Sequence, residues 1–269
     1  MQIIGGNMNS QENPSGKPLA NMTWLENHHI AKLPERTAFA KRLALLHPKR
    51  VVDLGCASGL WLELLNNFIP DNCEFIGIDS DYTSLESAKK RSQQWNRKSS
   101  FILLDIEKDA QRIPPSDLTL AFNIFPYIED LSAFINKLSL RKPTGALAVR
   151  QYDGAAIRFG PMITADRQRM EADLRLAMEN SQKIRHYDLD RTFRALHDSS
   201  YTRITCEFEL FKRTSPFPSD FIPYYMGTLE WTRDHVSEHS AKLLQAWIDD
   251  SSLQLCRYFY EVDLVAVLS

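Results

Sequence analysis

The stretch Val51-Val52-Asp53-Leu54-Gly55-Cys56-Ala57-Ser58-Gly59 decides the fold of this chain. Its first residues form a short apolar run typical of a buried strand, and small residues follow at once. Gly has no Cβ, and Ala and Ser carry little beyond theirs, so such a turn lets the backbone approach a ligand closely. A helical pattern then begins at Gly59-Leu60-Trp61-Leu62. A strand, a tight turn and a helix in this order are typical of a nucleotide-like ligand site.

The spacing of this turn excludes two common classes of nucleotide site. The dinucleotide fingerprint Gly-x-Gly-x-x-Gly is not matched. If Gly55 is its first glycine, the second and third glycines are replaced by Ala57 and Leu60. The phosphate loop ends in Gly-Lys-Ser/Thr, but Gly59 is followed by Leu60. No Lys or Arg between residues 51 and 70 could meet the charge of a phosphate. The turn therefore favours a cofactor without phosphates.

The composition is that of an ordinary globular protein with no electrostatic preference for nucleic acid. The 269 residues include 34 acidic and 32 basic side chains, giving a net charge of -2, and 43% are hydrophobic. The first 20 residues lack the apolar run of a signal peptide, and no stretch elsewhere approaches a membrane span. The four cysteines show no Cys-x-x-Cys spacing, and no metal-ligand spacing is visible. We expect a cytoplasmic protein without nucleic acid, membrane or metal; a homodimer stays open.

Short apolar runs and helical patterns alternate through residues 50–152. This alternation predicts an α/β fold, with a parallel sheet and helices on both of its faces. The expected strands are 50–54, 74–78, 100–104, 117–122 and 146–152, and the expected helices between them are 59–68, 82–95 and 130–138.

The second half of the chain has a different pattern. Helices are predicted over 165–181 and 188–198, and strands over 202–211 and 257–268. The strands are separated by about 40 residues, far more than a hairpin needs, so this connection is predicted to be an inserted cap with a helix over 239–248. Its aromatic residues could form a substrate pocket or the core of the cap itself: Phe217, Phe221, Tyr224, Tyr225 and Trp231.

The pattern predicts a single domain over residues 23–269, preceded by a disordered tail over 1–22. Its parts are N-terminal lid helices (23–49), a cofactor-binding core (50–152) and two substrate-side insertions (153–201 and 212–257). Pro34 divides the N-terminal helical pattern in two, and it suits the first turn of the second helix.

The turn resembles the glycine-rich motif Asp/Glu-x-Gly-x-Gly-x-Gly of the class I (Rossmann-like) S-adenosyl-L-methionine (SAM) dependent methyltransferases. It reads Asp53-x-Gly55-x-Ala57-x-Gly59, with Cys56 inside it, and departs from the motif by Ala57 at the middle glycine. The resemblance implies SAM as cofactor, S-adenosyl-L-homocysteine as product, and a seven-stranded mixed sheet that ends in an antiparallel hairpin. The turn residues are then predicted to contact the cofactor.

Acidic residues end the second and third predicted strands. Asp79, followed by Ser80, stands 24 positions after Gly55, where a carboxylate can accept both hydroxyls of a ribose. It could instead cap the next helix, although Ser80 and Asp81 are rivals for that role. The resemblance implies that Asp105 accepts the adenine amine and that the backbone of Ile106 contacts the ring; a surface turn is the alternative.

Two further residues are candidates for the methionine end of the cofactor. Asn123 follows the fourth strand, but its surroundings do not match the Asn/Asp-Pro-Pro-Tyr/Phe motif of amine methyltransferases, and the aromatic residues after it could be packing residues. Arg36 lies in the helix before the first strand, where relatives pair an arginine with the SAM carboxylate. A guanidinium matches a carboxylate with two hydrogen bonds, although a solvated arginine is equally compatible with the sequence.

Substrate-side candidates follow the fifth strand. We expect Tyr152 and Asp153 to contact the substrate, with Asp153 as proton acceptor, and His28 on the N-terminal helix as a rival catalytic residue. Arg150, within an apolar strand, must find a partner or point into the cleft.

These features predict a SAM-dependent methyltransferase that moves a methyl group to nitrogen or oxygen of a small molecule by in-line displacement. One alternative is a non-catalytic SAM-binding or partner-stabilising subunit, for which Ala57 is the hint. A second is an aminopropyltransferase-like enzyme, which would prefer an acid where Asn123 stands.

Overall fold

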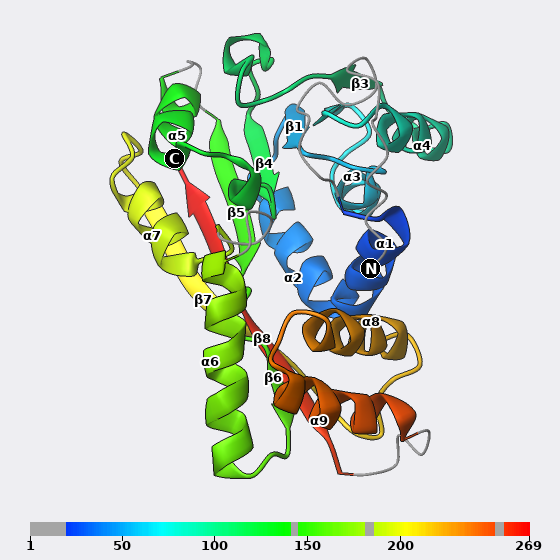
Figure 1. Ribbon diagram of the computed structural model, residues 1–269. Coiled ribbons are helices and arrows are strands. Elements are labelled where there is room, and N and C mark those ends of the chain that lie inside the picture. The colour runs from blue at the N-terminus through cyan, green and yellow to red at the C-terminus, as the bar shows by residue number, and fades with distance from the viewer. Residues whose placement is uncertain (1–19, 141–144, 181–185, 251–255) are drawn as a thin grey trace.

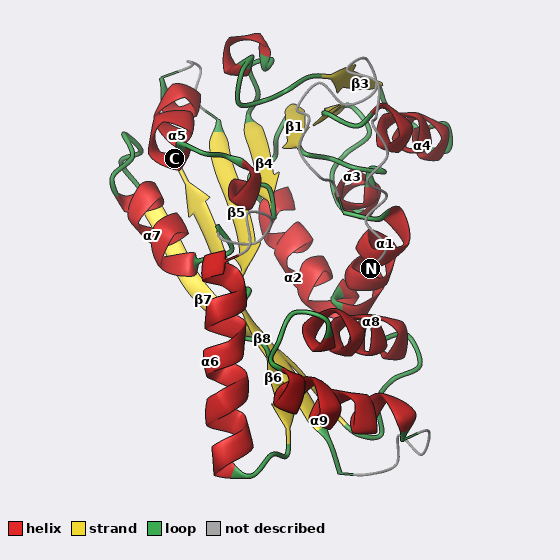
Figure 2. Cartoon of the chain, in the orientation of Figure 1, coloured by secondary structure: helices red, strands yellow, loops and turns green. Residues whose placement is uncertain are grey.

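In the computed structural model, residues 20–140, 145–180, 186–250 and 256–269 are described. Nearly all of the predicted N-terminal tail lies outside these residues. Figures 1 and 2 show one central sheet with helices on both sides and further helices below it. The helices are α1 (Met22–Ala31), α2 (Leu33–Ala44), α3 (Leu60–Asn66), α4 (Tyr82–Ser92), α5 (Leu131–Ser139), α6 (Thr164–Asn180), α7 (Leu189–His197), α8 (Ile222–Arg233) and α9 (Glu238–Asp249).

The sheet confirms the predicted Rossmann-like topology. Its strands are β1 (Arg50–Leu54), β2 (Glu74–Asp79), β3 (Ser99–Leu103), β4 (Leu118–Phe122), β5 (Ala146–Tyr152), β6 (Arg158–Gly160), β7 (Ile204–Thr214) and β8 (Tyr258–Leu268). The first five are parallel in the order β3-β2-β1-β4-β5. Strand β8 runs antiparallel to β5, and β7 pairs with β8 along its whole length. The chain therefore has the predicted C-terminal antiparallel pair.

The sheet has eight strands within the described residues, whereas seven were predicted. The additional strand is the three-residue β6, which pairs with β8 at Tyr258–Tyr260. Strand β6 has room there because the first residues of β8 do not pair with β5. The pairing between β8 and β5 starts at Asp263 of β8. The Tyr258 side chain packs on Gly160, where an added Cβ would lie 2.0 Å from the ring, so a larger residue in β6 would have to displace the end of this tyrosine.

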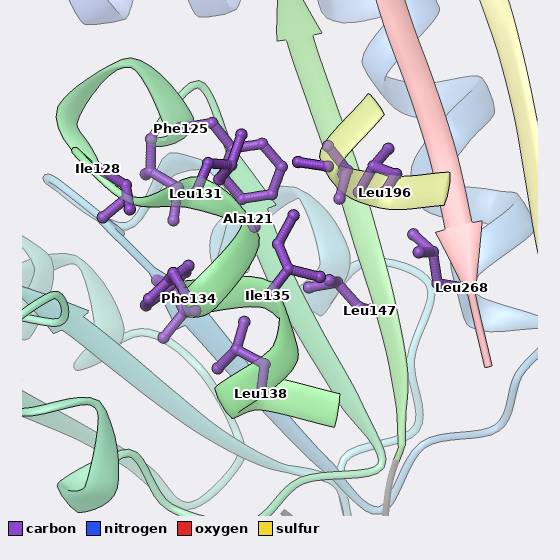
Figure 3. Packing of buried hydrophobic residues seen from close by; sticks show 14 of the residues in the cluster. Ala121, Phe125, Ile128, Leu131, Phe134, Ile135, Leu138, Leu147, Leu196 and Leu268 are labelled. Carbon is purple, nitrogen blue, oxygen red and sulfur yellow. The ribbon is translucent and has the colours of Figure 1, made fainter. Parts of the chain in front are cut away.

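Both faces of the sheet are covered, as the continuous apolar strands require. Along β1, Val51 packs with α2 and α3, and Val52 packs with the residues under α5 and α7. The sequence of α5 favours a helix because its apolar residues recur at positions i, i+3, i+4 and i+7, which places them all on one buried face. The buried face of α5 consists of Leu131, Phe134, Ile135 and Leu138. Figure 3 shows it packed against residues of β4, β5, α7 and β8: Ala121, Leu147, Leu196 and Leu268.

The insertion between β7 and β8 forms a helical cap, as expected, with α8 in addition to the predicted α9. Helix α8 begins with a proline in its first turn and packs beside α1 (Figure 1). Of the two roles that the sequence left open for the cap aromatics, the structure supports the core. Four of them form one buried cluster with Phe159, Phe211 and Phe259, and Trp231 packs against this cluster. The four are Phe217, Phe221, Tyr224 and Tyr225.

A buried ionic cluster joins the N-terminal helices to the C-terminal strands. Lys32, between α1 and α2, forms ion pairs with Glu261 and Asp263 of β8, and all three are nearly inaccessible to solvent. Arg150 of β5 pairs with Asp263 at 2.7 Å and with Glu209 of β7 at 2.7 Å, so it finds partners behind the cleft. The cluster fixes α1 relative to the sheet.

Replacing Lys32 by methionine is expected to lower the free energy of unfolding by about 3–5 kcal/mol, because it leaves buried carboxylates without their cation. The measurement is urea denaturation followed by circular dichroism. Lys242→Met is the matched control, because Lys242 forms an exposed pair with Glu238 and should cost less than about 1 kcal/mol. Equal losses in the two variants would contradict the structural role of Lys32.

Candidate active site

The turn after β1 is left-handed at three points. Gly55 has φ +67°, Ala57 has φ +45° and Gly59 has φ +80°. An added Cβ at Gly55 would lie 2.3 Å from Cγ2 of Ile124, so both backbone and packing require glycine there. Ala57 is the departure from the motif, and it holds a conformation that costs a non-glycine residue about 1–2 kcal/mol. The turn is thus formed without the middle glycine.

Hydrogen bonds join this turn to β2. The Cys56 N–H donates to the carbonyl of Ile78 at 3.0 Å, and the Ala57 N–H donates to Oδ2 of Asp79 at 2.7 Å. Oδ1 of Asp79 accepts from the Asp81 N–H at 2.9 Å, while the Asp81 side chain caps α4. Asp79 therefore positions the turn and leaves the cap of α4 to Asp81. The backbone of Ser80 also hydrogen-bonds to this carboxylate, and of its roughly four lone-pair sites one remains for a ligand.

One large cavity runs along the carboxyl ends of the parallel strands. It encloses about 1310 Å³ of space outside atoms, with its open mouth included. The sheet order β3-β2-β1-β4-β5 sets the order of the groups along it. Most of the predicted site residues line it: His28, Arg36, Asp53, Gly55, Cys56, Ala57, Asp79, Ser80, Asp105, Ile106, Asn123 and Tyr152. Gly59 and Asp153 are not among the lining residues.

Two neighbouring carboxylates make the β1–β2 part of the cavity acidic. Asp53 is buried, and its Oδ2 has no hydrogen-bond partner among the described residues. Burial, together with the nearby charge of Asp79, raises the pKa of Asp53 well above its usual range. Burial likewise raises the pKa of Asp79 to about 6, against the opposing effect of its backbone hydrogen bonds. A cationic ligand would compensate both groups.

Arg36 places an opposite charge in the same cavity. It is 4% exposed, and burial together with the charge of Arg150 lowers its pKa to about 9. Its guanidinium donates to Nδ1 of His29 at 2.7 Å and to Nδ1 of His28 at 3.3 Å, and it lies over the ring of Trp61. No carboxylate of the described residues lies within ion-pair distance, and its Nε–H is unpartnered. An anionic ligand group would satisfy it.

The β3 end of the cavity is formed by Asp105 and Ile106. Oδ1 of Asp105 accepts the backbone N–H groups of Glu107 and Lys108, and Oδ2 pairs with the Lys108 ammonium at 3.0 Å. Burial opposes the charge of Asp105, but the bonds from Lys108 and Glu107 outweigh it and hold the pKa below its usual value. Asp105 therefore closes a turn, but it is buried and not on the surface, and its ionised carboxylate lines the cavity.

Asn123 links β4 to β5 at the centre of the site. Its φ of +56° lies in the left-handed region that asparagine tolerates, and its Oδ1 accepts from the Tyr152 N–H at 3.3 Å. The side-chain carbonyl is therefore engaged with β5.

The β5 end is aromatic, and the sequence revealed only part of it. Trp24 and Leu25 of α1 line it with His28, opposite Tyr127, Tyr152 and Tyr187. Tyr187 was missed because it lies between two predicted helices, with no strand end or motif to single it out. Asp153 instead closes a turn, where Oδ1 accepts from the Ala155 and Ala156 N–H groups at 2.7 and 2.9 Å. The structure thus gives no support to Asp153 as a proton acceptor.

Comparisons with known proteins agree with this geometry. Residues 47–200 match the family described as "Methyltransferase domain". The chain is 30% identical over 115 residues to ubiquinone biosynthesis O-methyltransferase of Rhodopseudomonas palustris, a match that covers 41% of this chain and 42% of that protein. It is 32% identical over 138 residues to trans-aconitate 2-methyltransferase of Rhizobium leguminosarum, over 49% of this chain and 51% of that protein. These matches span about half the length of each relative.

Among solved structures, the YcgJ protein from Bacillus aligns with a TM-score of 0.52 at 12% identity, over 88% of this chain and 98% of that one, which shows a shared fold. Fold and site together define a class I, Rossmann-like methyltransferase. The chain belongs to the methyltransferase-domain family, and SAM is the cofactor of this class, as predicted.

Two further properties of the described residues bear on the site. None of their helices combines the length and the apolar character needed to cross a bilayer. No group of three or more His, Cys, Asp or Glu side chains among them is arranged to hold a metal ion.

Replacing Ala57 by glycine is expected to raise the free energy of unfolding by up to about 1 kcal/mol, because it removes the left-handed strain at φ +45°. Denaturation in urea provides the measurement. Ala133→Gly, in the right-handed helix α5, should instead lose roughly 0.5–1 kcal/mol. A loss of stability in both variants would show that the turn is not strained.

Proposed function

We propose that this protein transfers the methyl group of SAM to an oxygen or nitrogen of a small-molecule acceptor. The proposal rests on one observation: two buried groups, Asp53 and Arg36, line the same cavity, and neither has an ion-pair partner within the part of the chain that the structure describes. The methionine part of SAM carries an ammonium and a carboxylate on one carbon. The two protein charges are complementary to that pair, and each would gain the counter-charge that its burial requires.

The remaining predicted residues fit the rest of the cofactor in chain order. Asp79 and Ser80 would hold the ribose, and Asp105 with the backbone of Ile106 would hold the adenine, one strand further along the sheet. The turn at Gly55, Cys56 and Ala57 would let the backbone approach the cofactor closely. The acceptor would then occupy the aromatic end over β4 and β5, where Tyr152 lies.

Bound SAM would supply a methyl group on a sulfonium, which is already a good leaving group. The protein's own contribution is then to orient the acceptor in line with the methyl and to exclude water. The aromatic wall of the half-buried Trp24 and Tyr152 and the buried Tyr187 is suited to both tasks. Both relatives named above methylate small molecules by their printed names, and one is named as an O-methyltransferase, which supports an oxygen acceptor.

Calorimetric titration with SAM and S-adenosyl-L-homocysteine tests the proposal. We expect both to bind, and Arg36→Met to weaken binding by at least about tenfold, because it removes charge-assisted hydrogen bonds. Arg36→Lys, which keeps the charge, should recover part of the affinity. Arg42→Met is the control, since Arg42 pairs with Glu207 on the surface. Absence of any binding by the wild-type protein would refute the proposed function; binding without transfer would favour a non-catalytic SAM-binding subunit.

The affinity for S-adenosyl-L-homocysteine is expected to fall as the pH is lowered from 7 to 5. Burial raises the pKa of Asp79 to about 6, so the free protein gains stability when Asp79 is protonated below that pH, whereas ribose hydroxyls favour the ionised carboxylate. Titrations at several pH values measure the effect. Asp79→Asn should bind at least about tenfold more weakly at pH 7 and show a flatter pH profile. An unchanged affinity would contradict the ribose role.

A further inference from the structure

Among the described residues, the polar side chains that gather at the acceptor end of the cavity are suited to donate hydrogen bonds and not to accept a proton. Its polar walls are His28 of α1 and the hydroxyls of Tyr127, Tyr152 and Tyr187. The Tyr187 hydroxyl donates to that of Tyr127 at 3.4 Å, and the rings of Tyr152 and Tyr187 lie 4.9 Å apart. Burial raises the pKa of Tyr152 and Tyr187, and the pKa of Tyr127 is raised by Tyr187 and by burial. All three phenols therefore stay neutral and keep their hydroxyl hydrogens, and the hydrogen of Tyr187, directed to Tyr127 here, would turn toward a bound acceptor.

His28 is fixed as a donor too. Its Nδ1 lies 3.3 Å from a guanidinium nitrogen of Arg36, and a guanidinium can only donate, so Nδ1 must accept. Burial and the charges of Arg36, Lys32 and Arg150 lower the pKa of His28 well below its usual value, so the ring is neutral and carries its hydrogen on Nε2. That buried Nε2–H has no partner among the described residues. His28, predicted as a rival catalytic residue, is therefore placed to donate a hydrogen bond and not to accept a proton.

The charges around this end are otherwise balanced. Lys32 and Arg150 are paired with Glu261, Asp263 and Glu209 behind the wall, and the Glu261 carboxylate accepts the Tyr224 hydroxyl at 2.7 Å. Asp53 and Asp79 lie over β1 and β2, on the cofactor side. A phenol, alcohol or ammonium acceptor must lose a proton, and none of His28, Tyr127, Tyr152 and Tyr187 is in a form that takes one up. An acceptor that arrives already ionised avoids the problem.

We propose that the acceptor is a small carboxylic acid, bound as its carboxylate by the Nε2–H of His28 and the tyrosine hydroxyls, and that the product is its methyl ester. The inference rests on the proposed methyl transfer. A carboxylate oxygen forms the new O–CH₃ bond with its lone pair, and the C–S bond breaks with its electrons going to sulfur. The negative carboxylate and the positive sulfonium thereby become a neutral ester and a neutral thioether, and no proton is released.

The test uses the full chain with SAM labelled in the methyl group. Three matched panels are offered: small mono-, di- and tricarboxylic acids, phenols and alcohols of similar skeleton, and the corresponding amines. Methyl esters release labelled methanol in alkali, whereas ethers and methylamines do not. We expect alkali-labile product from the carboxylic acids. Alkali-stable product from phenols or amines, with inert carboxylic acids, would overturn the inference and leave the proposed function intact. No transfer to any panel, in a protein that binds SAM, would overturn both.

The pH profile and two variants give independent readouts. At saturating SAM, kcat/KM for the acceptor should be flat between pH 7 and 9, because a carboxylate is ionised throughout; a tenfold rise per pH unit would show that the acceptor must lose a proton. Tyr152→Phe and Tyr187→Phe should each raise the acceptor KM by about tenfold and leave the affinity for S-adenosyl-L-homocysteine unchanged. Tyr201→Phe, packed under α5 and α7, is the control and should change neither quantity. An unchanged acceptor KM in both tyrosine variants would contradict the assigned donors.

Discussion

The left-handed turn after β1 is the constraint on which the site depends. Gly55 must lack a side chain because Ile124, after β4, occupies the space where a Cβ would stand. The Ala57 N–H is held by the Asp79 carboxylate at the end of β2. One turn therefore brings the ends of three strands together, and the cavity forms at the edge where they meet. Ala57 shows that the hydrogen bond to Asp79 can hold this geometry even where glycine would be less strained.

The charges of the site are separated by the sheet topology. Asp53 and Asp79 belong to adjacent strands, so their carboxylates lie together and raise the energy of each other's ionised form. Arg36 comes from a helix that precedes the sheet, and it reaches the cavity from the side of α1. A ligand that carries positive and negative groups can satisfy both sides at once. Within residues 20–140, 145–180, 186–250 and 256–269 neither Asp53 nor Arg36 has an ion-pair partner. A zwitterionic cofactor bound here would remove the free-energy cost of burying both charges.

The sequence predicted the parts of the structure that depend on local pattern. The strands from Arg50 to Tyr152 alternate with helices because their apolar runs are short and bounded by acids and glycines. Asp79 was identifiable from its distance to the turn, and Arg36 from its place in the helix before the first strand together with the resemblance. The tautomer of His28 was not, because it depends on a contact with Arg36 that only the packing of α1 on α2 creates. Strand β6 escaped prediction since it exists only where β8 extends beyond β5.

The role of the cap illustrates the same limit. Its aromatic residues were equally compatible with a substrate pocket, yet they form a core against Phe211 and Phe259, and Tyr224 stacks on His28 from behind. Lys32 pairs with Asp263 and thereby holds the end of α1, the helix that carries His28, against β8. The cap and the ionic cluster therefore fix the position of α1 and the orientation of the His28 ring. In the proposed acceptor site, recognition would depend on α1 and on tyrosines such as Tyr127 after β4 and Tyr152 at the end of β5, while the cap would act one layer further out by keeping the Nε2–H in place.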